Sequence, residues 1–258
     1  MNEPPPDAVK PEEIHPPPRL GFTLLSTALV LGAYLVLQVV VTVVLIAALD
    51  LDPTERMGDL IALGVILSAL PCTFLLLLIL DRGGRARGMD PRTWLALRPV
   101  RGSTVLAWVV FAFVLLQLAD LVTVELGRSP VPPVMETIIE TTCYTTLLWF
   151  ALVIAAPVFE EALFRGFLYE GLRRTKIGAG GTIVVTTLLW TLLHVAQYDS
   201  FFLVLIALIG ILLGIARERT GSLYVPLAIH GVNNLLSTLQ MTEEGDALVN
   251  ALFLGMMR

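Results

Sequence analysis

Long apolar segments are the feature that most constrains how this chain can fold. There are seven of them, at about residues 21–48, 60–80, 104–124, 141–172, 182–197, 201–216 and 223–239. A helix needs about 20 apolar residues to cross a bilayer, and hydrocarbon offers backbone polar groups no partner outside the helix. Charged residues make up only 15% of the chain, against about 25% in soluble domains. We therefore expect an all-α, polytopic transmembrane bundle of about seven or eight helices.

The two ends of the chain differ from this apolar body. The first 18 residues hold seven prolines and charges of both signs, which is typical of a disordered tail with polyproline II character. We predict such a cytoplasmic tail over residues 1–19 and a membrane-embedded domain over residues 20–258. Residues 247–257 are apolar but too few to span alone, so we expect an interfacial segment or a re-entrant cap there.

Positive charges predict the orientation. With a cytoplasmic N-terminus, the inside segments 1–20, 81–103, 173–181 and 217–222 hold 13 of the 17 lysines and arginines, against three on the other side. Such an excess marks the cytoplasmic side. Because the chain is compact, we expect a multi-pass protein of a prokaryotic plasma or inner membrane, with the lipid bilayer as a partner. The net charge of -5 and the lack of a basic face with interleaved aromatic residues argue against nucleic acid.

Ionisable and amide side chains interrupt the apolar pattern in the second half of the chain. At 1.5 Å per residue, Glu160 and Glu161 lie about 20 Å from the cytoplasmic end of their helix, and His194 lies about 18 Å into the next. His230 and Asn234 lie roughly 10 and 16 Å into the last helix. A charged residue at the centre of a spanning helix costs about 2.5–3.5 kcal/mol. We therefore predict that these five side chains share one hydrated pocket inside the membrane.

Helical spacing separates the roles of the two glutamates. Glu161 and Arg165 are four residues apart and share a face, which predicts an ion pair. Glu160 is rotated by about 100° from Glu161 and stays available for chemistry. Pro157, nearly one turn before Glu160, should loosen the helix and admit water beside the polar side chains.

Small residues predict close packing elsewhere in the bundle. Gly210 and Gly214 form a GxxxG pair, which is typical of a close contact between two membrane helices. Cys72 and Cys143 both lie in apolar segments. We interpret them as packing residues rather than as a disulfide or metal ligands.

Three motifs on separate helices resemble those of the CPBP family, also called the Abi family, of CAAX-type prenyl proteases and bacteriocin-processing or immunity proteins. EEALFR, residues 160–165, looks like the EExxxR motif of that family. WTLLH, which ends at His194, is similar to FxxxH, with Trp190 in place of phenylalanine. HGVNN, residues 230–234, looks like HxxxN, and the resemblance covers about residues 141–240. It implies an intramembrane endopeptidase similar to type II CAAX prenyl endopeptidases, with a site open to the cytoplasmic side.

The resemblance also implies a role for each residue of the pocket. Glu160 is the general base that activates a water molecule, and Glu161 supports the site through its ion pair. His194 helps to position or polarise the water. His230 and Asn234 stabilise the oxyanion of the tetrahedral intermediate. These roles suit amide hydrolysis, which needs an activated water and donors aimed at developing negative charge.

The same side chains leave the cofactor and the substrate open. Two histidines and one carboxylate suit a catalytic zinc ion, and the ligands would be His194, His230 and Glu160. A metal-free mechanism, in which the glutamate activates the water, uses the same groups. The expected substrate is a peptide or a membrane protein, with or without a prenyl group.

Two other functions are compatible with buried ionisable groups. A proton-coupled transporter also uses intramembrane Glu and His, although the two halves of the chain show no inverted repeat. A catalytically silent bacteriocin-immunity or scaffold protein of the same fold is the third hypothesis. The sequence has neither the HExxH nor the GxSxG motif of other intramembrane protease classes.

Overall fold

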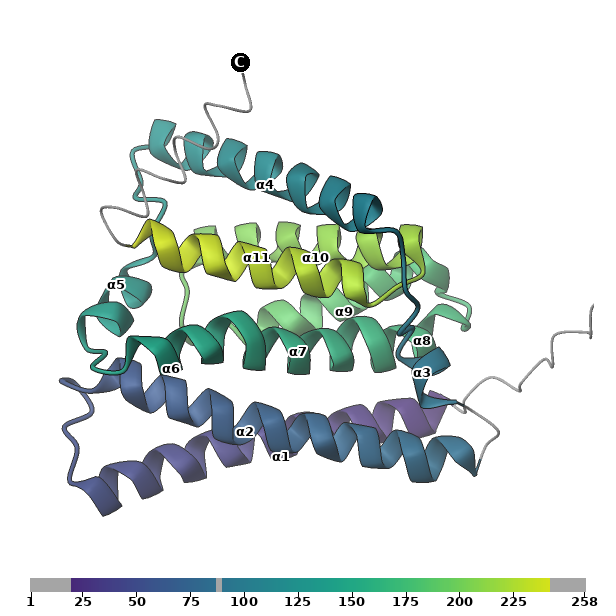
Figure 1. The fold of residues 1–258 in the computed structure, drawn as a ribbon, viewed down its shortest axis with the longest axis horizontal. Coiled ribbons are helices and arrows are strands. Elements are labelled where there is room, and N and C mark those ends of the chain that lie inside the picture. The colour runs from purple at the N-terminus through teal and green to yellow at the C-terminus, as the bar shows by residue number, and fades with distance from the viewer. Residues whose placement is uncertain (1–19, 87–89, 242–258) are drawn as a thin grey trace, which may run out of the picture.

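The computed structural model describes residues 20–86 and 90–241 (Figure 1). Within these residues the chain forms helices and no β-strand, which confirms the predicted all-α class. The predictions for the tail 1–19 and for the segment 247–257 concern residues outside the described ranges.

All seven predicted apolar segments form helices. The elements are α1 (Leu20–Leu49), α2 (Met57–Ile79) continued by the π-helix η1 (Leu80–Gly84), α3 (Pro91–Trp94), α4 (Gly102–Glu125), α5 (Pro133–Glu140), α6 (Thr145–Trp149), η2 (Phe150–Ala155), α7 (Ala156–Glu161), η3 (Ala162–Leu168), α8 (Tyr169–Arg173), α9 (Gly178–Leu192), α10 (Ser200–Thr220) and α11 (Tyr224–Gln240). Five helices of the described chain are long and apolar enough to cross a bilayer. The exceptions among the seven are α9 and α11, with 15 and 17 residues. The chain is thus a multi-pass membrane protein in which two predicted spans are short.

One continuous helical rod, Thr145–Arg173, forms the centre of the bundle. It comprises α6, η2, α7, η3 and α8, and we call it the central rod. α1 and α2 pack together against one side of it, whereas α11, α10 and α9 lie on the other side (Figure 1). α4 is the outermost helix and packs mainly against α11. The central rod therefore lies between two groups of helices.

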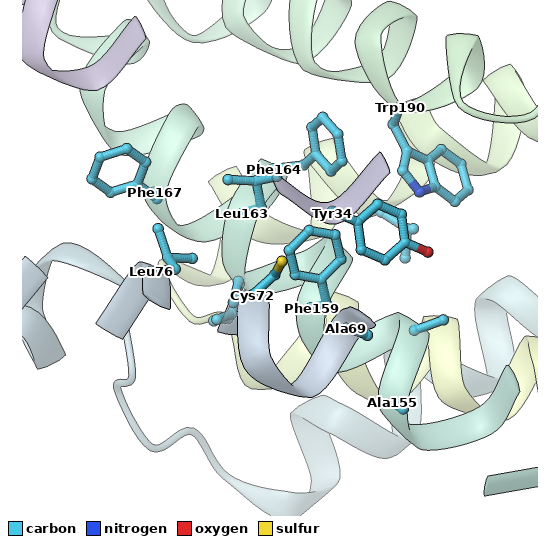
Figure 2. Close-up of a cluster of buried hydrophobic side chains, with 14 of the residues drawn as sticks. Tyr34, Ala69, Cys72, Leu76, Ala155, Phe159, Leu163, Phe164, Phe167 and Trp190 are labelled. Atoms are coloured by element: carbon cyan, nitrogen blue, oxygen red, sulfur yellow. The ribbon is translucent and has the colours of Figure 1, made fainter. Parts of the chain in front are cut away.

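Large apolar side chains of the central rod explain why it is buried. Phe159, Leu163, Phe164 and Phe167 are fully buried (Figure 2). Tyr34 of α1 stacks on Phe159 with ring centroids 4.5 Å apart. Large apolar side chains that gather on one face of a helix drive that face into the protein interior. This burial fixes the rotation of the rod and hence the directions of its polar side chains.

The two cysteines differ in their surroundings. Cys72 is buried in the core (Figure 2), as predicted for a packing residue. Cys143 is exposed in the turn before α6, so the prediction that it packs in an apolar segment is wrong. The reason is that α6 starts at Thr145, four residues later than the predicted span.

Apolar side chains also cover the outer surface of the bundle. Leu25 and Val39 of α1, Phe74 of α2, Leu188 of α9 and Val204 of α10 are each more than half exposed. Contiguous apolar surface of this extent is rare on soluble monomers. It suits contact with lipid around the bundle.

Two π-helical segments flank the glutamate pair of the central rod. η2 ends at Ala155 and η3 starts at Ala162, so only six residues of regular α-helix, with Pro157 near their start, separate them. Proline has no N–H, so a carbonyl of the preceding turn loses its helical partner. The carbonyl of Leu152 instead accepts a hydrogen bond of 2.8 Å from Asn234 Nδ2. The predicted loosening at Pro157 is therefore present, and it supplies an anchor for α11.

The GxxxG pair makes the predicted close helix contact, and its partner is α9. A Cβ atom at Gly210 would lie 2.8 Å from Thr187 Cγ2, and one at Gly214 would lie 2.9 Å from Ile183 Cγ2. Both distances are shorter than van der Waals contact. These glycines set the separation between α9 and α10.

We expect Gly214→Ala to lower the free energy of unfolding by about 1–3 kcal/mol, because the added methyl group overpacks the contact with Ile183. Gly180→Ala is the matched control, since its Cβ would meet no atom within 4 Å, and alanine stabilises an exposed helix by about 1 kcal/mol. Unfolding in detergent micelles measures both changes. Equal stability of the two variants would contradict the close contact.

Candidate active site

The structure brings the predicted polar residues together at the middle of the bundle. The central rod supplies Glu160 and Glu161, and α11 supplies His230 and Asn234. His230 Nε2 lies 3.9 Å from Glu160 Oε2, and His230 Nδ1 lies 2.9 Å from Glu161 Oε1. Glu160, His194, His230 and Asn234 line one cavity of about 770 Å³, which we call the chamber. Glu161 does not line it.

Glu161 is the buried centre of a charged network. Its Oε1 atom accepts hydrogen bonds from Arg165 Nη1 at 2.7 Å and from His230 Nδ1 at 2.9 Å. Arg165 is also fully buried and donates to the carbonyl of Gly210 at 3.2 Å. The predicted ion pair is thus confirmed. Because Glu161 holds the Nδ1 side of the imidazole, the Nε2 side of His230 is directed toward Glu160.

Glu160 is the acid that faces the chamber. Its Oε2 atom accepts a hydrogen bond of 2.5 Å from the indole Nε1 of Trp190. The residue keeps 9% of its surface exposed, whereas Glu161 has none. The rotation between neighbouring helical positions therefore gives the two carboxylates different surroundings: Glu161 faces its counter-ion and Glu160 faces the space where a ligand can bind.

Trp190 has a role that the sequence analysis missed. In the motif that ends at His194, it stands only as an aromatic ring in the place of phenylalanine. In the structure its N–H holds Glu160, and the guanidinium of Arg165 lies 4.7 Å from the centroid of the indole ring. The signal that could have revealed this is the residue type itself, because tryptophan has a ring N–H donor and phenylalanine has none.

His194 lies outside the helix in which it was predicted. α9 ends at Leu192, so the predicted span to Gln197 is wrong, and His194 occupies the following turn. Its Nδ1 lies 3.0 Å from the carbonyl of Trp190, an acceptor that assigns the ring hydrogen to Nδ1. The imidazole still packs edge-to-face against Trp190, with centroids 5.0 Å apart, and reaches the chamber.

The two asparagines of α11 act as a pair. Asn234 uses one N–H to bind the carbonyl of Leu152, and its Oδ1 accepts a hydrogen bond of 3.1 Å from Asn233 Nδ2. Asn233, which is no part of the HxxxN pattern, lies beside Asn234 and also lines the chamber.

The donors present do not form a metal site in this arrangement. Among residues 20–86 and 90–241, no group of three His, Cys, Asp or Glu side chains has the mutual geometry to hold an ion. Catalytic zinc needs three protein ligands at about 2.0–2.2 Å from one point. Here His230 and Glu160 bind their own neighbours, Glu161 and Trp190, through hydrogen bonds. We therefore derive no step through a metal.

Comparison with known proteins bears on the segment that builds the chamber. Residues 142–236 match the family of type II CAAX prenyl endopeptidases described as Rce1-like. A protein of Escherichia coli named "Uncharacterized 24.3 kDa protein" is 26% identical over 149 residues, which cover 54% of this chain and 67% of that protein. No solved structure matches the chain significantly. The segment with all the predicted catalytic residues thus matches the Rce1-like family of type II CAAX prenyl endopeptidases, in agreement with the resemblance of its three motifs.

Proposed function

We propose that the protein is an intramembrane endopeptidase of the CAAX type, in which Glu160 activates a water molecule. The observation that carries this proposal is the contrast between the two glutamates. Glu161 is neutralised by Arg165 and turned inward, whereas Glu160 faces a chamber of about 770 Å³ beside His230. A base must reach its water, and a supporting carboxylate need not.

The proposed reaction uses this arrangement. Glu160 takes a proton from water while the water oxygen attacks the carbonyl carbon of the peptide bond. The carbonyl electron pair moves onto oxygen, and in this proposal His230 and the second amide N–H of Asn234 stabilise that oxyanion. The proton held by Glu160 then passes to the amine nitrogen as the C–N bond breaks. His194, which also lines the chamber, orients the water.

The test is a cleavage assay with the purified full chain in liposomes, after removal of zinc verified by elemental analysis. Quenched peptides with and without a prenylated cysteine serve as substrates, and mass spectrometry identifies the bond that is cut. We expect hydrolysis by the zinc-free protein. Glu160-dependent proton flux without hydrolysis of any peptide would replace the proposal with the transporter hypothesis, and recovery of activity only with zinc would replace the metal-free mechanism.

We expect Trp190→Phe to lower kcat about 10- to 100-fold while KM stays unchanged. A hydrogen bond to a charged group contributes about 1.5–3 kcal/mol, and phenylalanine keeps the ring beside Arg165 while removing the N–H. Trp108→Phe is the matched control, because Trp108 lies on α4 and does not line the chamber. Steady-state kinetics of the two variants measure this effect. An unchanged kcat in Trp190→Phe would show that the indole does not position Glu160.

A further inference from the structure

The chamber extends from Glu160 toward one end of the bundle only. Its lining includes Pro53 in the connection between α1 and α2, Pro130 in the connection between α4 and α5, and Met135 in the first turn of α5. It also includes Met241, directly after α11. All these positions belong to the end at which α1 and α4 finish and the central rod begins (Figure 1).

The other end of the bundle is closed below Glu161. Leu163, Phe164 and Phe167 are fully buried there. Trp94 stacks on Phe167 with centroids 5.7 Å apart, and its Nε1 donates to the carbonyl of Phe167 at 3.2 Å. No residue of these layers lines the chamber.

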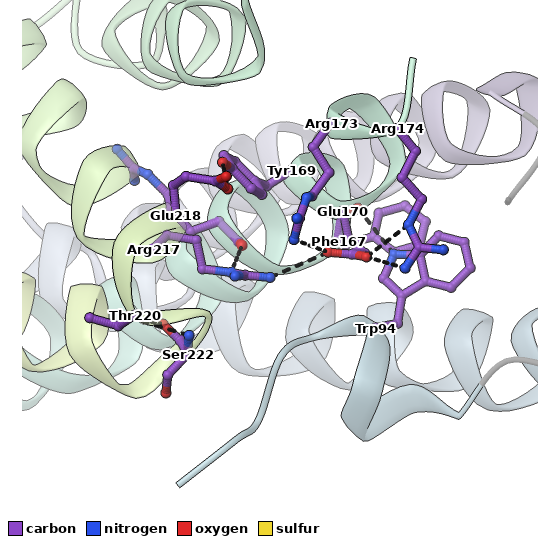
Figure 3. Close-up of polar contacts among 11 residues, drawn as sticks. Trp94, Phe167, Tyr169, Glu170, Arg173, Arg174, Arg217, Glu218, Thr220 and Ser222 are labelled. Carbon is purple, nitrogen blue, oxygen red and sulfur yellow. Dashed lines mark hydrogen bonds and ion pairs between the residues drawn. The ribbon is translucent and has the colours of Figure 1, made fainter. Parts of the chain in front are cut away.

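A second charged network fastens the closed end (Figure 3). Glu170 of α8 pairs with Arg174 at 2.5 Å and with Arg217 of α10 at 3.4 Å. Arg217 is almost fully buried, and its Nε donates to the carbonyl of Arg165 at 2.9 Å. These contacts join α8, η3 and α10, and none of the residues that make them lines the chamber.

Positive charge is concentrated at the closed end. Ten described lysines and arginines lie there, namely Arg82, Arg85, Arg92, Arg98, Arg101, Arg173, Arg174, Lys176, Arg217 and Arg219. At the open end the described chain has Arg56 and Arg128, which pair with Asp59 and Asp199. An excess of Lys and Arg marks the cytoplasmic side. The closed end is thus the one that the charge rule places in the cytoplasm.

We propose that the chamber is entered from the non-cytoplasmic side of the membrane, and that its occupant is an extended, apolar segment of an exported or membrane protein. That this segment is then cleaved rests on the proposed function. It differs from the cytoplasmic opening that the family resemblance implies. The charged residues lining the described chamber are Asp120 and Glu160 on the acidic side, with His194 and His230, and no Lys or Arg. A segment that carries basic residues therefore fits better than one that carries acidic residues.

Cysteine labelling tests the side of entry without any need for catalysis. The background is Cys143→Ser in the full chain, because Cys143 is exposed and Cys72 is buried. One reporter is Ser237→Cys on the chamber wall, and the matched reporter is Gly180→Cys, an exposed site at the closed end where a Cβ meets no atom within 4 Å. We expect a membrane-impermeant thiol reagent to label Ser237→Cys in intact cells and Gly180→Cys only in inverted vesicles. Labelling of Ser237→Cys solely in inverted vesicles, or from neither side, would overturn the proposal.

Protection by peptides tests the occupant. A leucine-rich peptide that carries lysines should slow the labelling of Ser237→Cys about tenfold at about ten times its Kd, because about one chamber in ten is then free. A matched peptide with glutamates in place of the lysines should protect less, and equal protection by the two would overturn the charge preference. Labelling of Ser237→Cys in the Glu160→Gln variant measures the side of entry without the proposed base. If no peptide is ever cleaved, the proposed function fails while the measured side of entry stands.

Discussion

The Glu160→Gln variant is expected to lose peptide hydrolysis, with kcat reduced about 10²–10⁴-fold, because glutamine keeps the shape of the side chain but cannot take a proton from water. The indole N–H of Trp190 can still bind the amide oxygen, so the chamber wall should remain in place. Turnover of the best cleaved peptide, measured in liposomes, gives the size of the effect.

Glu125→Gln is the matched control for this change. Glu125 is exposed at the end of α4 and does not line the chamber. The kcat of the Glu125→Gln variant should therefore equal that of the wild type. Both variants should be folded at the assay temperature, which their thermal unfolding curves check. If Glu160→Gln kept the turnover of the control, Glu160 would not be the base.

The largest effect on stability is expected for Arg165→Met. This change leaves Glu161 buried without its counter-ion, and breaking a buried pair by removing one partner costs about 3–5 kcal/mol. The double variant Glu161→Gln/Arg165→Met removes both charges and should regain most of that loss, since glutamine can still accept the hydrogen bond from His230. Free energies of unfolding in detergent measure both.

Arg174→Met provides the comparison for an accessible ion pair. Arg174, directly after α8, also pairs with a glutamate four residues before it, but 45% of its side chain is exposed. Exposed pairs contribute about 0–1 kcal/mol, so this variant should be nearly as stable as the wild type. A similar loss in Arg165→Met and Arg174→Met would show that burial of the Glu161 pair does not govern stability.

The elements of the fold could be predicted because they depend on local composition. Apolar runs of sufficient length determine helices in a membrane, and the spacing of Glu161 and Arg165 determines a shared face. Only the ends of elements were misplaced, as at Leu192 and Cys143, since helix termini depend on contacts that the sequence does not display.

The details of the site depended on contacts between distant segments. The bond between Trp190 and Glu160 joins residues 30 positions apart, and the bond between Asn234 and Leu152 joins residues 82 apart. Neither follows from helical periodicity. The open end of the chamber could not be read from motifs either, because it depends on how connections such as the one at Pro130 are arranged around the bundle.

Helix α4 differs from the other walls of the chamber in how it is held. It packs mainly against α11 and buries few residues, among them Phe113 and Gln117, which also line the chamber. The central rod, by contrast, is joined to α11 by the buried contact between Glu161 and His230. Elements with few buried contacts open at the lowest free energy. We therefore expect α4 to be the wall of the chamber that moves outward most easily, while Glu160 and His230 keep their places.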